Sequence, residues 1–267
     1  MPFAEVNGIR IHYERAGQGE PLILVTGLAG STAFWNKTVP LLTDSFDVIT
    51  VDNRGAGTTE YSGSFSMKDM ADDIVALMDC LELRKTHLLG WSMGSHISLN
   101  LAARYTERII SLTLVSSYLR RPARSAYLLN ALAESYRNGE ISAEMVGRMM
   151  NVLLRTSGYF DSAEKAGRCI NCPDPGPANG MYDQMSAVED YDPSLDAGRI
   201  TVPTLSVHGL EDIMTEPACG DDLADRIPGC RRIRVPEEGH ILRPESYIPA
   251  FREFVFAVKS NTVDRMD

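Results

Sequence analysis

Residues 86 to 94 read Thr-His-Leu-Leu-Gly-Trp-Ser-Met-Gly, and this stretch decides the fold. The apolar run Thr86 to Leu89 predicts a short buried strand, and Ser95 to Tyr105 predicts a helix soon after it. The residues between them, Gly90 to Gly94, have the pattern G-x-S-x-G, which joins a strand to a helix through a very tight turn. A side chain at either glycine would collide with the flanking strand or helix. We therefore expect a strained backbone at Ser92, with its hydroxyl raised out of the sheet edge.

This turn also places Ser92 and Met93 at a helix N-terminus, where unpaired backbone N–H groups favour a developing negative charge. Ser92 is therefore the candidate nucleophile. The alternative interpretation is that Ser92 is only a small residue linking a strand to a helix.

Strand and helix patterns alternate outward from this turn. Such alternation predicts an α/β fold, a mostly parallel sheet with helices on both faces. Before the turn we expect strands at Ile9 to Glu14, Pro21 to Thr26 and Val48 to Val51, with helices at Ser31 to Leu42 and Met67 to Leu83. After it we expect strands at Ile110 to Val115, Thr204 to Val207 and Arg231 to Val235, with helices near Glu216 to Arg226 and Ser246 to Val258.

The alternation stops between residues 118 and 198, which contain no strand-like run. Helical patterns cover Tyr127 to Tyr136 and Ala143 to Leu154, and a loop rich in Pro and Gly lies at Cys172 to Gly180. We interpret residues 118–198 as an inserted helical cap, and residues 1–117 together with 199–267 as the core domain.

Composition excludes several classes of function. The 267 residues include 26 Lys and Arg against 36 Asp and Glu, a net charge of −10, which argues against a nucleic-acid partner. No apolar run reaches the roughly 20 residues of a membrane span, and the N-terminus lacks the pattern of a signal peptide. We expect a cytoplasmic protein that acts on a small molecule and binds neither nucleic acid nor membrane.

The five cysteines are scattered, which suits a reducing compartment. Cys169 and Cys172 form a lone C-x-x-C without a second pair or a nearby histidine at ligand spacing. We therefore expect neither a metal site nor a cofactor.

A serine nucleophile needs a base, and His240 is the best placed of the five histidines. It lies in the loop Glu237-Glu238-Gly239-His240, after the last strand, and this loop opens at the same sheet edge as Ser92. His12 and His87 lie in or beside early predicted strands, where core or edge packing is the expected role. His96 lies on the helix after the turn and is expected to point away from the sheet edge, and His208 ends a predicted strand at a backbone position.

The base in turn needs a carboxylate, which the chain order Ser, acid, His places between residues 92 and 240. Asp212 is the candidate, in the acidic loop His208 to Asp212 that follows a predicted strand. Glu211 is its rival, and Asp221 or Asp222 are weaker alternatives.

An oxyanion in the transition state needs two N–H donors. One is expected from Met93, directly after the nucleophile. The other is expected from Leu28 in the loop Thr26-Gly27-Leu28-Ala29-Gly30. The alternative reading of that loop is a simple Gly-rich turn. It does not cradle a phosphate, because it has neither a P-loop Lys nor G-x-G-x-x-G spacing.

Over essentially its whole length the chain resembles the α/β-hydrolase superfamily, and most closely its small microbial esterase and enol-lactonase branch. The resemblance rests on the turn at Gly90 to Gly94, the acid loop, Gly239-His240 and the D-x-R-G-x-G turn at Asp52 to Gly57. Two positions depart from the family pattern. Thr26 stands where many relatives have His, and Ser95 stands where many have a further Gly.

The resemblance implies an α/β-hydrolase fold with a Ser-His-Asp triad, a backbone oxyanion hole and a cap. The expected activity is that of a serine hydrolase cleaving an ester or lactone of a small, mostly apolar metabolite. The same triad serves C–C bond hydrolases of ring-cleavage products, and a non-catalytic ligand receptor is a further alternative. Five residues are expected to contact the substrate: Trp91, Arg120, Arg121, Met149 and Met150.

Overall fold

The computed structural model describes residues 2–165 and 174–263. Eight strands among them form one sheet in the order β1-β2-β4-β3-β5-β6-β7-β8. The strands are β1 (Phe3–Val6), β2 (Ile9–Gly17), β3 (Glu20–Val25), β4 (Phe46–Val51), β5 (Thr86–Trp91), β6 (Ile109–Val115), β7 (Thr204–Gly209) and β8 (Arg231–Val235). Strand β2 pairs antiparallel with both β1 and β4. Every other pair, from β4 across the sheet to β8, is parallel.

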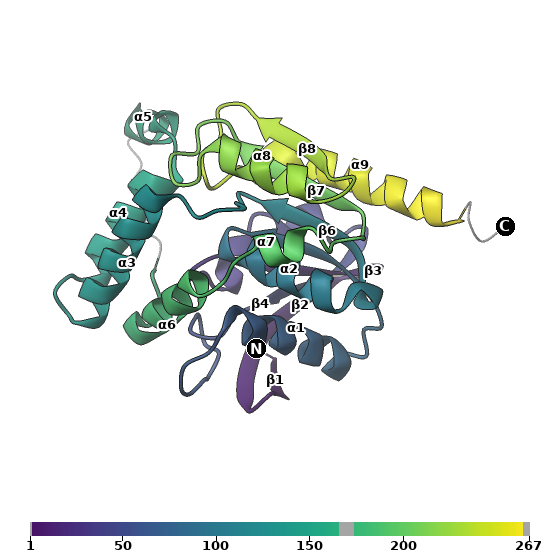
Figure 1. The fold of residues 1–267 in the computed structure, drawn as a ribbon, viewed down its shortest axis with the longest axis horizontal. Helices are drawn as coiled ribbons and strands as arrows, with labels where there is room; N and C mark the ends of the chain where they lie inside the picture. Colours follow the sequence, from purple (N-terminus) through teal and green to yellow (C-terminus); the bar gives the residue numbers. More distant parts are fainter. Residues whose placement is uncertain (1, 166–173, 264–267) are drawn as a thin grey trace.

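Helices cover both faces of this sheet (Figure 1). Along β3, Ile23 and Val25 belong to a hydrophobic core shared with α1, α2, α7 and α8, whereas Leu22 and Leu24 belong to a second core shared with η1 and α9. The helical elements are η1 (Thr32–Trp35), η2 (Val39–Leu41), α1 (Met67–Cys80), α2 (Met93–Arg104), η3 (Thr106–Arg108), α3 (Ala123–Arg137), α4 (Ala143–Leu154), α5 (Ser157–Lys165), α6 (Ala178–Glu189), α7 (Ser194–Ala197), α8 (Pro217–Arg226) and α9 (Pro244–Val263). The predicted α/β architecture is confirmed.

One predicted helix is wrong. The segment from Ser31 to Leu42 forms two short 3₁₀ helices, η1 and η2, instead of one α-helix. Pro40 lies inside η2, and a proline there cannot donate the backbone hydrogen bond that an α-helix requires. The apolar spacing that suggested a helix instead serves burial, since Trp35 is only 1% exposed.

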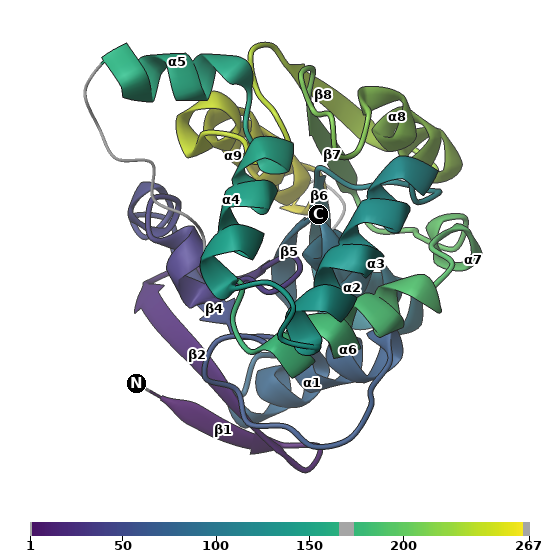
Figure 2. The same cartoon turned by 90° about the vertical axis from the view of Figure 1, so that its left-hand side faces the viewer.

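Four helices follow β6 and lie to the left of the sheet in Figure 1: α3, α4, α5 and α6. Figure 2 looks onto α3, α4 and α6 from that side, with the sheet behind them. Helix α7 lies within the predicted limits of the cap, yet it packs on α2 and α8 of the core, and Asn100 of α2 donates to its Asp196 at 2.8 Å. We therefore propose that the cap ends with α6. Cys169 and Cys172 lie outside the described residues.

None of the described helices has the length and apolar character needed to cross a membrane.

Candidate active site

The turn between β5 and α2 holds Ser92 in a strained backbone conformation, with φ +54° and ψ −120°. Gly90 and Gly94 make this turn possible. A Cβ on Gly90 would lie 2.4 Å from the Gly94 carbonyl oxygen, and one on Gly94 would lie 2.1 Å from the Val25 carbonyl oxygen. Both distances are prohibitively short, so the collisions expected from the sequence are real.

The two departures from the family pattern both have partners. The Ser95 hydroxyl donates to the Gly90 carbonyl at 2.6 Å and accepts from the Val115 N–H at 3.1 Å, which ties α2 to β5 and β6. The Thr26 hydroxyl donates to the Gly30 carbonyl at 2.9 Å and so closes the loop after β3. These bonds stabilise the two turns beside Ser92.

His240 lies against Ser92 although 148 residues separate the two in the chain. Its Nε2 is 2.9 Å from the Ser92 Oγ, and its Nδ1 is 2.8 Å from the Asp212 Oδ2. A carboxylate only accepts hydrogen bonds, so Nδ1 carries the proton and Nε2 is free to accept the serine proton. The structure thus brings together the three side chains predicted as nucleophile, base and acid.

The other histidines have partners of their own. His12 pairs with Asp52 at 2.8 Å, and His87 contacts the Ser111 hydroxyl at 2.7 Å. His96 donates to the Tyr118 carbonyl at 3.0 Å, and burial lowers its pKa to about 4, so it stays neutral near pH 7.

Asp212 is buried and accepts hydrogen bonds on both carboxylate oxygens. Oδ1 accepts from the N–H groups of Met214 and Thr215 at 2.9 and 2.8 Å, which holds the loop after β7 around the carboxylate. Burial raises the pKa of Asp212, but the electrostatic interaction with the His240 imidazole and the hydrogen bonds from His208, His240 and Thr215 outweigh burial. Its pKa therefore lies well below the usual range, and the group is ionised at neutral pH. Its rival Glu211 is exposed.

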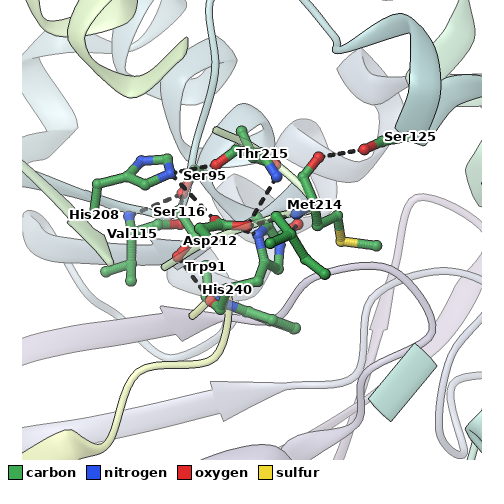
Figure 3. A network of polar contacts seen from close by, with 12 residues as sticks. Trp91, Ser95, Val115, Ser116, Ser125, His208, Asp212, Met214, Thr215 and His240 are labelled. Atoms are coloured by element: carbon green, nitrogen blue, oxygen red, sulfur yellow. Dashed lines mark hydrogen bonds and ion pairs between the residues drawn. The ribbon is translucent and has the colours of Figure 1, made fainter. Parts of the chain in front are cut away.

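His208 is a second partner of Asp212, which sequence reasoning placed only at the end of a strand. Its Nε2 donates to the Thr215 carbonyl at 2.7 Å and lies 3.2 Å from the Asp212 Oδ2 (Figure 3). Gly220 of α8 leaves room for this ring, since a Cβ there would lie 2.3 Å from the His208 Nδ1. The spacing of four residues between His208, near the end of β7, and Asp212 in the following loop was the signal that the sequence offered.

The main chain of His240 is anchored to the central strands. Its carbonyl oxygen accepts from the Trp91 Nε1 and from the Ser116 hydroxyl, both at 2.8 Å (Figure 3). Ser116 has a φ of +52°, a strained value for a residue other than glycine. The ends of β5 and β6 therefore hold the backbone of His240, while Asp212 orients its ring.

The loop after β3 lies beside Ser92, as expected for an oxyanion loop. A Cβ on Gly27 would lie 3.1 Å from the Ser92 Cβ, and Leu28 and Met93 line a cavity together with Ser92. Ala29 in this loop has a φ of +58°, another strained backbone position.

Gln184 of α6 links this loop to the cap. It is fully buried, its Oε1 accepts from the Ala29 N–H at 2.7 Å, and its Nε2 donates to the Arg54 carbonyl at 2.6 Å. Gly180, one helical turn earlier, lies so close to Gly55 that a Cβ would be 2.0 Å from the Gly55 carbonyl oxygen. A polar residue within the buried stripe of α6 was the only sequence signal for this contact.

Replacing Gln184 by leucine should lower kcat by about ten- to a hundredfold with little change in KM, because the oxyanion loop loses its support while its donors remain. Ser186→Ala is the matched control, since Ser186 is exposed on the same helix, donates only to the Tyr182 carbonyl within α6 and should lose no activity. Steady-state kinetics and thermal melting of both variants provide the measurement. A leucine variant with a lower melting temperature but unchanged kcat would show that Gln184 has only a structural role.

Ser92 and His240 border a cavity of about 100 Å³ whose wall is mainly apolar. Trp91 and Phe34 line this cavity with their ring centroids stacked at 4.3 Å, and Met150 of α4 also belongs to the lining. Two of the residues expected at the substrate, Trp91 and Met150, therefore lie at this cavity.

The structure places Met149 and Arg120 elsewhere. Met149 is 40% exposed on the outer side of α4, because successive helical residues are rotated by about 100° and Met150 takes the inward position. Arg120 is exposed and lines none of the described cavities around Ser92. Arg121 borders a smaller cavity beside Ser92, but its guanidinium is paired with Glu189 and also donates to Asn130 at 3.1 Å.

Across residues 2–165 and 174–263, His, Cys, Asp and Glu side chains do not gather into a group able to hold a metal ion.

Comparison with known proteins identifies the family of this chain. The sequence model of the protein family described as alpha/beta hydrolase fold matches residues 20–246 of this chain. The "Putative carbamate hydrolase RutD" of Variovorax paradoxus (strain S110) is 30% identical over 241 residues, covering 86% of this chain and 89% of that protein.

Two solved structures superpose over nearly the whole chain. The thermophilic esterase from Thermogutta terrifontis, solved with malate bound, has a TM-score of 0.83 at 26% identity and covers 94% of both chains. The enol-lactonase from Burkholderia xenovorans LB400 has a TM-score of 0.81 at 24% identity, covers 98% of this chain and 100% of that one, and shares the fold. With its tight turn at Ser92, its mostly parallel sheet and its helical insertion, this chain belongs to the alpha/beta hydrolase fold family.

Proposed function

We propose that this protein is a serine hydrolase that cleaves a carboxylic ester or lactone of a small, mostly apolar metabolite through an acyl-enzyme. The observation that carries the proposal is the hydrogen-bonded series from Asp212 through His240 to Ser92, at the wall of an apolar cavity. A serine beside a histidine that a buried carboxylate orients is the arrangement that makes a hydroxyl nucleophilic.

In the first half of the reaction, the Ser92 Oγ attacks the ester carbonyl while His240 Nε2 takes the hydroxyl proton. The carbonyl oxygen becomes an oxyanion, for which the N–H groups of Leu28 and Met93 are the proposed donors. The bond from the carbonyl carbon to the alcohol oxygen then breaks. His240 returns its proton to that oxygen, and the acyl group remains on Ser92.

In the second half, a water molecule attacks the acyl carbon and gives one proton to His240 Nε2. The bond to Ser92 Oγ breaks, the serine recovers its proton, and the carboxylic acid leaves. Asp212 stays ionised throughout and stabilises the cationic imidazole that forms in each half.

The names of similar proteins support hydrolysis. The relatives with 30% and 26% identity are named a carbamate hydrolase and an esterase. A non-catalytic receptor has no need for His240 to be held by Asp212, Trp91 and Ser116 at once. These contacts favour catalysis over binding alone.

A burst experiment tests the proposal. Rapid mixing with p-nitrophenyl acetate should release about one equivalent of nitrophenol quickly, followed by slower turnover, since acylation of Ser92 precedes hydrolysis. Intact-protein mass spectrometry after acid quenching should show one added acetyl group. Peptide mapping of the same sample should place that group on the peptide that contains Ser92. Hydrolysis of a neutral lactone is measured in the same way for comparison, by following the acid that the ring opening produces.

The outcomes separate the alternatives. Reaction of Ser92 with a fluorophosphonate, but no turnover of any ester or lactone, would point to hydrolysis of a different bond, including the C–C bond of a ring-cleavage product. Neither labelling nor turnover would leave only the binding interpretation.

A further inference from the structure

Two cavities meet at Ser92. One, of about 100 Å³, is lined by His240 and Ile241 together with Trp91 and Met150, and we call it the histidine-side lobe. The other, of about 40 Å³, is lined by Met93 and Thr215 with Met185 and Val188 of α6, and we call it the oxyanion-side lobe. Both lobes share four lining residues: Leu28, Ser92, Leu129 and Met214.

The direction of proton transfer assigns the lobes. In the tetrahedral intermediate, the reacting carbon carries the Ser92 Oγ, the oxyanion, the alcohol oxygen and the acyl chain. The alcohol oxygen must lie within hydrogen-bonding reach of His240 Nε2, because this nitrogen returns the proton. The acyl chain takes the remaining direction, which points away from His240. His240 borders the histidine-side lobe and not the oxyanion-side lobe.

We propose that the histidine-side lobe holds the alcohol part of the ester and the oxyanion-side lobe holds the acyl part. The inference rests on the proposed function and adds which half of the substrate is small. The protein is then a hydrolase of short-acyl esters of larger, apolar alcohols. Long-chain acyl esters fall outside its range.

Volume sets the acyl limit. About 40 Å³ is room for roughly three water-sized groups, at 10–15 Å³ each, and so for a chain of about three carbons beyond the carbonyl. Met185 and Val188 line this lobe and are themselves buried, with exposed fractions of 4% and 9%. We therefore expect straight acyl groups up to about the length of butyrate to fit this lobe, and longer ones to meet the side chains of α6.

Charge restricts both parts to neutral groups. In the oxyanion-side lobe, the Arg121 guanidinium is already paired with Glu189, so a carboxylate on the acyl part would have to compete for it. In the histidine-side lobe, Asp174 is one of the lining residues, and its negative charge disfavours an anionic alcohol part. The remaining wall is mainly apolar, which favours hydrocarbon groups.

Two ester series test the assignment. In the first, p-nitrophenyl esters lengthen from acetate through butyrate to octanoate at a constant alcohol part. In the second, the acyl part stays acetate while the alcohol part grows from methyl through butyl to cyclohexyl. Turnover of this series is measured by the acid that is released. We expect kcat/KM to fall at least tenfold from butyrate to octanoate, and to rise along the acetates as more apolar surface is buried.

Three methionine variants give a matched set. Met185→Ala enlarges the oxyanion-side lobe and should raise the octanoate to acetate ratio about five- to tenfold, with the acetate series unchanged. Met150→Ala enlarges the histidine-side lobe and should change only the series of alcohol parts. Met149→Ala, on the exposed side of α4, should change neither. Val188→Ala replaces Met185→Ala if that variant fails to fold.

The possible results are distinct. Octanoate cleaved as fast as acetate by the unmodified protein would overturn the inference while leaving the proposed function intact. So would a Met185→Ala variant that alters the alcohol series instead of the acyl series. Absence of turnover in both series, with no acyl group on Ser92, would overturn the proposed function and the inference with it.

Discussion

Replacing Ser92 by alanine should abolish ester turnover, with a loss of about 10⁴ to 10⁶ in kcat and an intact fold. The change removes one hydroxyl whose contact is His240 Nε2 at 2.9 Å, and no strand or helix depends on it. The backbone strain at this position persists in the variant, since alanine meets the same φ of +54°. The measurements are kcat with a short-chain aryl ester, and labelling by a fluorophosphonate followed by peptide mapping.

Ser98→Ala is the matched control. Ser98 lies two turns into the same helix α2, is fully buried, and its hydroxyl has no hydrogen-bond partner in the described part of the chain. Its loss should change neither turnover nor labelling. Phosphonate labelling that persists in Ser92→Ala would disprove the assignment of the nucleophile.

Replacing Asp212 by asparagine should lower kcat by about 10⁴, because the amide nitrogen can donate to His240 Nδ1 and stabilise the wrong tautomer of the ring. The size of the effect follows from the geometry, since Oδ2 of Asp212 lies 2.8 Å from Nδ1 of His240 inside the protein. His208 also contacts that oxygen, so the variant disturbs both imidazoles. Steady-state kinetics and thermal melting of the purified variant separate catalysis from stability.

Glu211→Gln supplies the comparison in the same loop. Glu211 is exposed, and its contact with the His240 loop is a backbone one, from its N–H to the Glu238 carbonyl at 2.9 Å. Its side chain can therefore change with little effect on turnover. If Glu211→Gln were the more damaging of the two substitutions, the orienting carboxylate would have been misassigned.

Much of the site could be predicted because its constraints are local. The turn at Ser92 depends on two glycines within five residues, a pattern that is visible in the sequence. The collision at Gly90 is with Gly94 of the same turn, whereas the collision at Gly94 is with Val25 of β3. The α/β architecture follows from apolar periodicity, which each element carries within its own residues. Chain order and loop position then singled out Asp212 and His240, because parallel strands bring their carboxyl ends to one edge.

Periodicity failed where one residue type overrides the pattern. Residues 31–42 have the apolar spacing of a helix, but Pro40 interrupts the backbone hydrogen bonds and two 3₁₀ turns result. The cap shows a related limit. Two of its helices, α3 and α4, could be predicted, yet which side of α4 faces the cavity depends on how the helix is rotated against the core. Met150 is buried as a result, and Met149 is exposed.

The sequence by itself thus determined the fold family, the turn that holds Ser92 and the loops that carry its partners. Only the tertiary structure decided what joins those loops. Gln184 reaches Ala29 across 155 positions of the chain, and Arg121 meets Glu189 across 68. No periodicity or spacing encodes such pairs, because they form only when separate elements pack together. The division of the cavity into two lobes at Ser92 arises in the same way, from cap side chains that meet the core in space.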